Sequence, residues 1–340
     1  MKLSIALAVA VSVVVTGADA AMCPSTSEGL PPTGFQSTVH ITSSGQDRTY
    51  ALFVPPGYDP GHAYALTFGF HGDGGTGPGI RNALGLEAPA NGAAIFVYPD
   101  ATVASGQSFD LDSPLATNED MTLVQDILAS LETLYCVDLS LVFATGFSRG
   151  GYFANFLNCR IGAATFRAIA PQAGSGPYGA DYDDAGHFIC EATAAAALLI
   201  HGASDTVVPI PDAAYSRDQW IFANQCSNTT TAYKPSPCAS YNGCSEDKPV
   251  VWCAVPGLGH AIWTEAAATT WSFFASFATT VPEPASSLLG LGSLGALLVL
   301  RLATDAGCRW AAQERLRNAT SSVTQSRNPT QRGYIEAPPR

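Results

Sequence analysis

The chain has 340 residues, of which 47% are hydrophobic and 13% are charged. This balance excludes an intrinsically disordered protein, and the frequent Gly and Pro residues exclude a polytopic membrane protein. The formal net charge of −12 excludes nucleic acid as a partner, because binding it needs Lys and Arg to neutralise phosphates. We therefore expect a globular body whose ligands are uncharged at the site.

The first twenty residues have the pattern of a secretory signal peptide. Lys2 precedes an apolar run from Leu3 to Val15, and Ala18-Asp19-Ala20 supplies the small residues of a cleavage site. The run lacks the helical face that a buried N-terminal helix, the alternative, would need. We expect residues 1–20 to be removed and the rest of the chain to be exported.

The number and placement of the cysteines are consistent with an exported protein. Eight of the nine lie between Cys23 and Cys253, an even number that suits disulfides in an oxidising compartment. No His accompanies the closely spaced Cys238, Cys244 and Cys253 at the spacing of a zinc site, so no metal is expected. The pairing itself cannot be read from spacing.

Short apolar runs then alternate with helical patterns. The segment from Gln36 to Pro55 predicts an edge hairpin that turns at Ser44-Gly45. Further strands are predicted at Ala65–Phe70, Ala94–Tyr98, Leu141–Thr145, Ala168–Pro171, Ala195–Ile200 and Val250–Val255. This rhythm is typical of an α/β domain, a mostly parallel sheet flanked by helices, over residues 21–280.

The clearest helix runs from about Glu119 to Tyr135, with Thr117 or Asn118 placed to cap it. Its apolar face, which we expect to pack on the sheet, consists of Met121, Val124, Leu128, Leu131 and Tyr135. The segment Ala173–Thr193 is the one stretch placed to cover the site, and it is too short and too rich in Gly and Asp for a helical lid. No large lid domain is expected.

Ser148 lies in Gly146-Phe147-Ser148-Arg149-Gly150, after the predicted strand Leu141–Thr145 and before a helical stretch that reaches about Arg160. A strand, a sharp turn and a helix are the setting of a nucleophile elbow, in which glycines allow the strained turn that exposes the serine hydroxyl. The same motif also occurs as a simple Gly-rich turn, so residues further along the chain decide between the two.

Two later residues complete the pattern. Asp205 follows the predicted strand Ala195–Ile200, and His260 follows Val250–Val255. Ser, Asp and His in this order are typical of α/β-hydrolases. We therefore expect that fold, with Ser148 as nucleophile, His260 as the base that accepts its proton, and Asp205 as the carboxylate that orients the base. A turn-forming Asp and a surface-loop His are the alternatives.

The oxyanion that forms during attack on an ester needs backbone N–H donors. Arg149, which follows the nucleophile, and Gly72 and Asp73, in the Gly-rich loop after the third strand, are the candidates. A tight strand-to-helix connection is the alternative for that loop. His71 and His201 are expected to support the site. Candidate substrate contacts are Trp263, Tyr152 and Trp220, although aromatic side chains more often pack in the core.

The stretch Cys136–Ser148, the helix start Asn118–Asp120, and the segments Ile200–Pro209 and Pro249–His260 resemble secreted feruloyl esterases. The same superfamily contains polyhydroxybutyrate depolymerases. The resemblance covers residues 23 to 278 and implies hydrolysis of the ester between ferulate and arabinose on xylan or pectin, without a cofactor. Polyester depolymerase activity is one alternative, and a non-catalytic protein that binds polysaccharide at the cell surface is another.

Two positions depart from the pattern expected of close relatives. Arg149 stands where a tyrosine is expected, and Phe109–Asp112 stands where a Trp-Ala-Asn-like stretch is usual. Both are placed to affect the acyl pocket. The resemblance also implies a disulfide between Cys226 and Cys244. The further candidate pairs are Cys23–Cys190, Cys136–Cys159 and Cys238–Cys253, which leave Cys308 over.

The C-terminal region, Val281-Pro282-Glu283-Pro284-Ala285 followed by the apolar run Ser286–Leu300 and Arg301, resembles a PEP-CTERM sorting signal of Gram-negative bacteria. It implies transient membrane anchoring through residues 285–300, a sorting protease, and a final location outside the inner membrane. A core helix is the alternative. Residues 302–340 hold six of the sixteen basic residues and have the composition of a disordered tail, although such signals usually end soon after the basic cluster. The oligomeric state is not determined by these patterns.

Overall fold

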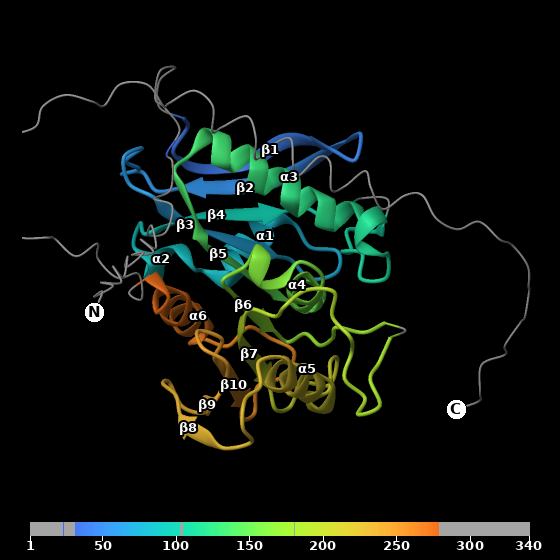
Figure 1. Cartoon of the computed structure of the whole chain (residues 1–340). Coiled ribbons are helices and arrows are strands. Elements are labelled where there is room, and N and C mark those ends of the chain that lie inside the picture. Colours follow the sequence, from blue (N-terminus) through green and yellow to red (C-terminus); the bar gives the residue numbers. More distant parts are fainter. Residues whose placement is uncertain (1–22, 24–30, 103–104, 180, 279–340) are drawn as a thin grey trace, which may run out of the picture. The chain divides into compact units, whose positions relative to one another are not determined.

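The computed structural model describes residue 23 and residues 31–102, 105–179 and 181–278. These residues form a sheet with the strand order β1-β2-β4-β3-β5-β6-β7-β10-β9-β8 (Figure 1). The strands are β1 (Gly34–Ser43), β2 (Gln46–Val54), β3 (Tyr64–Phe70), β4 (Ala94–Pro99), β5 (Val137–Phe147), β6 (Ala168–Gln172), β7 (Ala196–Gly202), β8 (Thr230–Ala232), β9 (Ala239–Tyr241) and β10 (Val250–Val255).

The middle of the sheet is parallel. β4, β3, β5, β6, β7 and β10 all run in one direction, whereas the β1–β2 hairpin joins β4 antiparallel at one edge. The predicted hairpin, its turn and the six further strands are confirmed. The short strands β8 and β9, which extend the other edge antiparallel, escaped prediction because three-residue strands on the surface carry little alternation of polarity.

Helices cover both faces of the sheet. They are α1 (Gly77–Leu84), α2 (Glu87–Ala90), α3 (Glu119–Leu134), α4 (Arg149–Arg160), α5 (Ile210–Ala223) and α6 (Ala266–Ala275), with 3-10 turns at Leu115–Thr117 and Gly162–Ala164. α3, α4 and α5 share one apolar core with the sheet, and in Figure 1 they lie together on one face. α1 and α6 contribute to a second core on the opposite face.

Helix α3 shows how the sequence positions one loop of the site. Asn118 caps it by accepting a hydrogen bond from the backbone N–H of Met121 (2.9 Å), while the Asn118 amide donates to the carbonyl of Asp110 (3.0 Å). The predicted helix is confirmed, with Asn118 rather than Thr117 as the cap. The cap therefore also holds the loop that precedes the helix.

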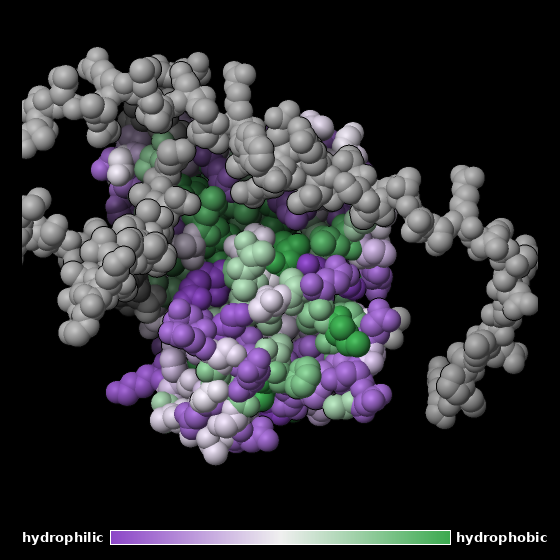
Figure 2. All heavy atoms as spheres, viewed as in Figure 1, coloured by the Kyte–Doolittle hydropathy of each residue, from purple (hydrophilic) through white to green (hydrophobic). Residues whose placement is uncertain are grey.

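Between β6 and β7, the described residues form no helix, as expected for a chain without a helical lid. One isolated bridge joins Tyr182 and Phe188 in this segment. Figure 2 shows that the surface around β8 and β9 is mostly hydrophilic, whereas apolar patches lie nearer the centre of the same view. Among the described residues, no helix combines the length and apolarity needed to cross a membrane.

Four disulfides cross-link the described residues: Cys23–Cys136, Cys159–Cys190, Cys226–Cys244 and Cys238–Cys253. The last two pairs were predicted and are confirmed. The predicted pairs Cys23–Cys190 and Cys136–Cys159 are wrong, because the segment before β7 passes beside the end of α4. There the N–H of Ala192 donates to the carbonyl of Cys159 (3.0 Å), which brings Cys190 to Cys159 and leaves Cys136 for Cys23.

The predicted signal peptide (1–20), sorting segment (281–301) and tail (302–340) lie outside the described residues.

Candidate active site

Ser148 occupies a sharp turn between β5 and α4. Its backbone has φ 55° and ψ −120°, a conformation that a residue with a side chain adopts only when its surroundings enforce it. The Ser148 N–H donates to the carbonyl of Gln172 on β6 (2.9 Å), and its carbonyl accepts from Gly151 and Tyr152 (2.8 and 3.0 Å). The neighbouring strand and the helix thus hold the turn from both sides.

The glycines around Ser148 are required by close backbone contacts. A Cβ atom on Gly146 would collide with the carbonyl of Gly150, and one on Gly150 would collide with the carbonyl of Phe70 on β3. The helix can therefore begin directly against the sheet, as the sequence pattern predicted.

The three residues predicted as a triad lie together. The Nε2 atom of His260 is 3.0 Å from the Oγ atom of Ser148, and its Nδ1 atom is 2.8 Å from the Oδ2 atom of Asp205. Asp205 and His260 lie on neighbouring loops, after the parallel strands β7 and β10. A hydrogen bond from the Ser204 N–H to the Leu258 carbonyl (2.9 Å) joins these two loops.

The carboxylate of Asp205 is fully buried. Its Oδ1 atom accepts hydrogen bonds from the backbone N–H groups of Val207 and Val208, both at 2.9 Å. Burial raises the pKa of Asp205, but the hydrogen bonds from His260, Val208 and Val207 outweigh it and lower the pKa below its ordinary value. The carboxylate is therefore charged and fixed in orientation at neutral pH.

A second buried histidine contacts the same carboxylate. His201, at the end of β7, places its Nε2 atom 2.9 Å from the carbonyl of Val208 and 3.5 Å from the Oδ2 atom of Asp205. Because a carbonyl can only accept, Nε2 carries the proton. Burial lowers the pKa of His201 despite the opposing effects of Val208 and Asp205. His201 is thus a neutral donor that holds the loop bearing Asp205.

The loop predicted to supply oxyanion donors lies against the nucleophile. A Cβ atom placed on Gly72 would stand 3.3 Å from the Cβ atom of Ser148 and 3.5 Å from the carbonyl oxygen of Phe147, so Gly72 lies close to the nucleophile turn. Arg149 is the first residue of α4, where the N–H groups have no partner within the helix. Arg149 thus follows Ser148 directly, and Gly72 lies close to Ser148 in a neighbouring loop that also carries Asp73.

The side chain of Arg149 points to the loop that follows β4. Its Nε atom donates to the carbonyl of Phe109 (2.8 Å) and lies 3.9 Å from Asp73. Phe109 itself is buried, with its ring against those of Phe70, Phe153 and His71. Of the two departures from the expected pattern, Arg149 is thus partly exposed beside Ser148, whereas the Phe109 ring belongs to the core.

The three candidate aromatic contacts differ in exposure. Trp263 and Tyr152 are partly exposed, and Tyr152 lies one helical turn after Ser148. Trp220 was a wrong prediction, since it is fully buried and its indole N–H donates to the Oδ1 atom of Asn155 (2.8 Å). Its place on the inward face of α5 explains the error, because a single Trp in sequence does not reveal which face it occupies.

A buried ion pair that was not predicted from the sequence holds the loop after β4. Arg48 on β2 contacts Asp120 on α3 (2.5 Å), and the other oxygen of Asp120 accepts from the N–H of Asp110 (2.8 Å). This pair anchors the loop that carries Phe109. The sequence held little signal for it, because Arg48 lies in the polar first half of β2 and Asp120 in the first turn of α3, where an acidic residue is common on the surface.

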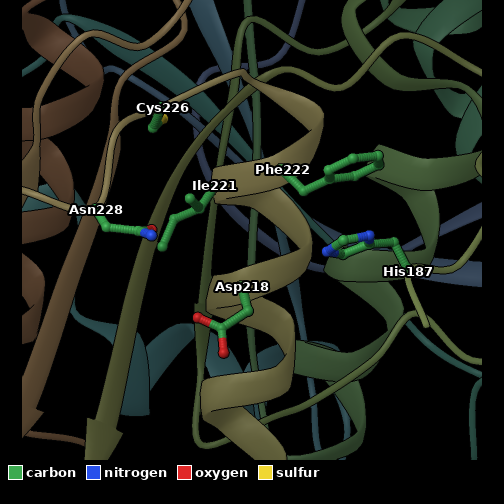
Figure 3. Close-up of a pocket in the computed structure, with 6 residues that line it drawn as sticks. All are labelled: His187, Asp218, Ile221, Phe222, Cys226 and Asn228. Atoms are coloured by element: carbon green, nitrogen blue, oxygen red, sulfur yellow. The ribbon is translucent and has the colours of Figure 1, made fainter. Parts of the chain in front are cut away.

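A pocket of about 290 Å³ lies near the end of α5. It is lined by His187, Asp218, Ile221, Phe222, Cys226 and Asn228. Figure 3 shows His187 and Phe222 on one side of the helix, where their rings stack at 3.8 Å. No triad residue lines this pocket. Among the described residues, no group of three or more His, Cys, Asp and Glu is arranged to hold a metal ion.

Two comparisons of sequence bear on this site. The chain is 32% identical over 246 residues to feruloyl esterase C of Emericella nidulans, which covers 67% of this chain and 83% of that protein. It is 28% identical over 287 residues to feruloyl esterase D of Neurospora crassa, covering 76% and 92%. No protein-family model matches the chain.

Solved structures show the same fold. An acetyl xylan esterase from Aspergillus awamori superposes with a TM-score of 0.54 at 16% identity, over 70% of this chain and all of that one. A ferulic acid esterase gives a TM-score of 0.50 at 15% identity, over 72% and 98%. The predicted α/β-hydrolase fold is confirmed by these likenesses together with the parallel sheet and its flanking helices.

Proposed function

The chain belongs to the feruloyl esterase family, and from that premise we propose that it hydrolyses feruloyl esters of plant cell-wall polysaccharide through an acyl-enzyme on Ser148. The observation that carries the mechanism is the continuous hydrogen-bonded line from the Oγ atom of Ser148 through His260 to the buried Asp205. That family membership makes the protein a carboxylic-ester hydrolase.

In the proposed mechanism, the Ser148 hydroxyl attacks the ester carbonyl while the Nε2 atom of His260 accepts its proton. The resulting imidazolium donates through Nδ1 to Asp205, whose negative charge stabilises it. His260 then protonates the departing sugar oxygen, which releases the alcohol and leaves ferulate bound to Ser148. Water, deprotonated by His260, hydrolyses that ester and restores the serine.

The oxyanion of each tetrahedral intermediate would be stabilised by backbone N–H groups of Arg149 and of the loop Gly72–Asp73. Backbone N–H groups, unlike side chains, need no reorganisation as charge develops. The proposal uses no metal or cofactor, since a serine, an imidazole and two or three N–H donors supply every proton and charge that ester hydrolysis requires.

Substrate contacts are proposed at Tyr152 and Trp263, the two candidate rings that are partly exposed. Burial, with smaller effects from Tyr178, Asp212 and Asp205, raises the pKa of Tyr152 to about 12. Its hydroxyl therefore stays neutral at working pH and can donate to or accept from the phenol, methoxy or sugar oxygens of the substrate.

The substrate proposal is tested with purified enzyme on methyl ferulate, feruloylated arabinoxylan and short hydroxybutyrate oligomers. We expect turnover of both feruloyl esters and little turnover of the oligomers. Hydrolysis of the oligomers alone would overturn the feruloyl proposal in favour of the polyester depolymerase alternative.

Catalysis itself is tested with a fluorophosphonate probe, which labels an activated serine. We expect the wild-type protein to be labelled and the Ser148→Ala variant to remain unlabelled while melting at nearly the same temperature. A correctly folded wild-type protein that resists the probe and binds polysaccharide would instead favour the non-catalytic alternative.

We also propose export followed by processing at both ends. Four disulfides among the described residues fit an oxidising compartment outside the cytosol. The signal peptide and the PEP-CTERM-like segment are proposed from sequence alone. Intact-mass measurement of the protein recovered from its natural host should show a chain that begins at Ala21 and ends near residue 285, and a mature chain that retains residues 1–20 or 286–340 would contradict this.

A further inference from the structure

His71 is a buried histidine beside the nucleophile that the mechanism above does not use. It follows β3 directly, and only 2% of its surface is exposed. Its ring packs on that of Phe109, with centroids 4.7 Å apart, and its backbone begins the loop that contains Gly72 and Asp73. The next residue, Gly72, lies close to Ser148, since a Cβ atom placed on it would stand 3.3 Å from the Ser148 Cβ atom.

The two ring nitrogens of His71 form hydrogen bonds with different backbone groups, one with a carbonyl and the other with an N–H. The Nδ1 atom lies 2.7 Å from the carbonyl oxygen of Gly72, which can only accept. The Nε2 atom accepts a hydrogen bond from the N–H of Ala101, after β4 (3.1 Å). These partners require a neutral imidazole with its proton on Nδ1.

The bond to Gly72 determines how one peptide group is oriented. The Gly72 carbonyl accepts from His71 and also from the N–H of Gly75 (3.0 Å). In a trans peptide, the carbonyl of one residue and the N–H of the next point in opposite directions. The N–H of Asp73 is therefore directed away from His71 and Gly75. The hydrogen bonds found among the described residues include none that this N–H donates.

We propose that His71 is a positioning residue: its neutral imidazole clamps the Gly72–Asp73 peptide between β3 and the end of β4, so that the Asp73 N–H is kept for the oxyanion. This inference rests on the proposed ester hydrolysis and deepens it. It assigns a role in transition-state stabilisation to a side chain that touches neither substrate nor reacting atoms.

The clamp has a direct consequence for acid sensitivity. Protonation would put a second hydrogen on Nε2, opposite the N–H of Ala101, and would break that bond. Burial lowers the pKa of His71, against the bond to Gly72 and the charges of Asp100, Asp120 and Asp73. These carboxylates lie on the loop after β4, on α3 and on the loop of His71 itself, and Asp120 is paired with Arg48. The clamp should therefore hold at neutral pH and fail in acid.

Two substitutions distinguish the effect of the His71 hydrogen bonds from the effect of its ring packing. His71→Asn keeps an amide donor close to the place of Nδ1, whereas His71→Phe keeps the ring against Phe109 and loses both hydrogen bonds. For His71→Phe we expect kcat on methyl ferulate to fall roughly 10- to 100-fold with KM little changed, somewhat less than loss of an oxyanion donor costs. His71→Asn should recover most of kcat.

Inhibition by a boronic acid, which forms a tetrahedral adduct with the serine, distinguishes a role in oxyanion stabilisation from a purely structural role. The Ki of the boronic acid should rise by about the same factor as kcat falls in His71→Phe, while the KM of the ester stays constant. The acid limb of the kcat/KM profile should also become less steep in His71→Asn, because one of the protons that inactivate the enzyme is gone.

The matched control is Asn224→Ala, which removes another buried hydrogen bond, from Asn224 to the carbonyl of Ala195, before the start of β7 and thus at the opposite end of that strand from Asp205. It should lower stability without changing kcat per labelled enzyme. Wild-type kcat in both His71 variants would overturn the proposal, as would a loss fully explained by a smaller labelled fraction. Absence of esterase activity and labelling in the wild-type protein would instead refute the proposed function.

Discussion

Asp205 and His260 are joined by a hydrogen bond of 2.8 Å between Oδ2 and Nδ1, although 55 residues separate them in sequence. The other oxygen of Asp205 is bonded to the N–H groups of Val207 and Val208. One oxygen of the carboxylate thus faces the imidazole, while the other holds its own loop, so the two oxygens can be tested separately.

Asp205→Asn should lower kcat by about 10⁴-fold, because an amide does not hold the imidazole in the tautomer and charge state that the reaction needs. Asn can still accept from Val207 and Val208, so stability should change little. Asp205→Ala should lose activity to a similar degree and in addition about 1–3 kcal/mol of unfolding free energy, since it leaves the buried N–H of Val208 and the partly buried N–H of Val207 without this acceptor. Steady-state kinetics and urea unfolding check both. Equal stability of the two variants would contradict the second role.

Substitutions of Trp263 and Trp220 test the proposed substrate contacts, with the buried Trp220 as the control. Trp263→Ala should raise KM for methyl ferulate several-fold, because Trp263 is partly exposed and lies three residues after His260. Trp220→Ala should leave KM unchanged in the folded protein and cost about 3–5 kcal/mol of stability, as expected for a fully buried Trp. Kinetics and thermal melts on both variants check this, and an unchanged KM in Trp263→Ala would remove that residue from the substrate site.

Stability should fall as pH falls below about 6.5, the ordinary pKa of histidine. Burial holds the pKa values of His71 and His201 below that value in the folded protein. The unfolded chain takes up these protons first, so the stabilisation is complete above the unfolded pKa and is lost as pH falls through the folded pKa. The lowered pKa of Asp205 acts in the same direction, but below its ordinary value of 3.8.

Melting temperatures between pH 7.5 and 5 measure this effect. His201→Gln retains a donor for the carbonyl of Val208 and does not titrate, so its melting temperature should depend less steeply on pH than that of the wild type. The same slope in both proteins would mean that burial of His201 does not contribute to acid sensitivity.

Peptide mapping without reduction should recover Cys159 linked to Cys190 and Cys23 linked to Cys136. Replacing Cys159 and Cys190 together by Ala should cost about 3–4 kcal/mol, because this bridge closes a 31-residue loop and restricts the unfolded chain. Urea unfolding measures that loss. Recovery of a peptide linking Cys136 to Cys159 would restore the candidate pair that we named from the sequence.

Local patterns predicted much of this molecule because each rests on short-range physics. The alternating apolar runs identified the central strands, and the glycines around Ser148 identified a turn that only they permit. The order of Ser148, Asp205 and His260 could be read because each follows a buried strand, and parallel strands end at one edge of a sheet.

The sequence by itself determined the residue types of the site, the order in which they occur and the sheet that carries them. Only the tertiary structure decided which helix faces turn inward, and therefore that Trp220 is buried. It also decided which distant segments meet, and therefore that Cys159 pairs with Cys190. It also decided the hydrogen-bond partners of His71. Those outcomes depend on contacts between residues far apart in the chain, and no local pattern of polarity or spacing encodes such contacts.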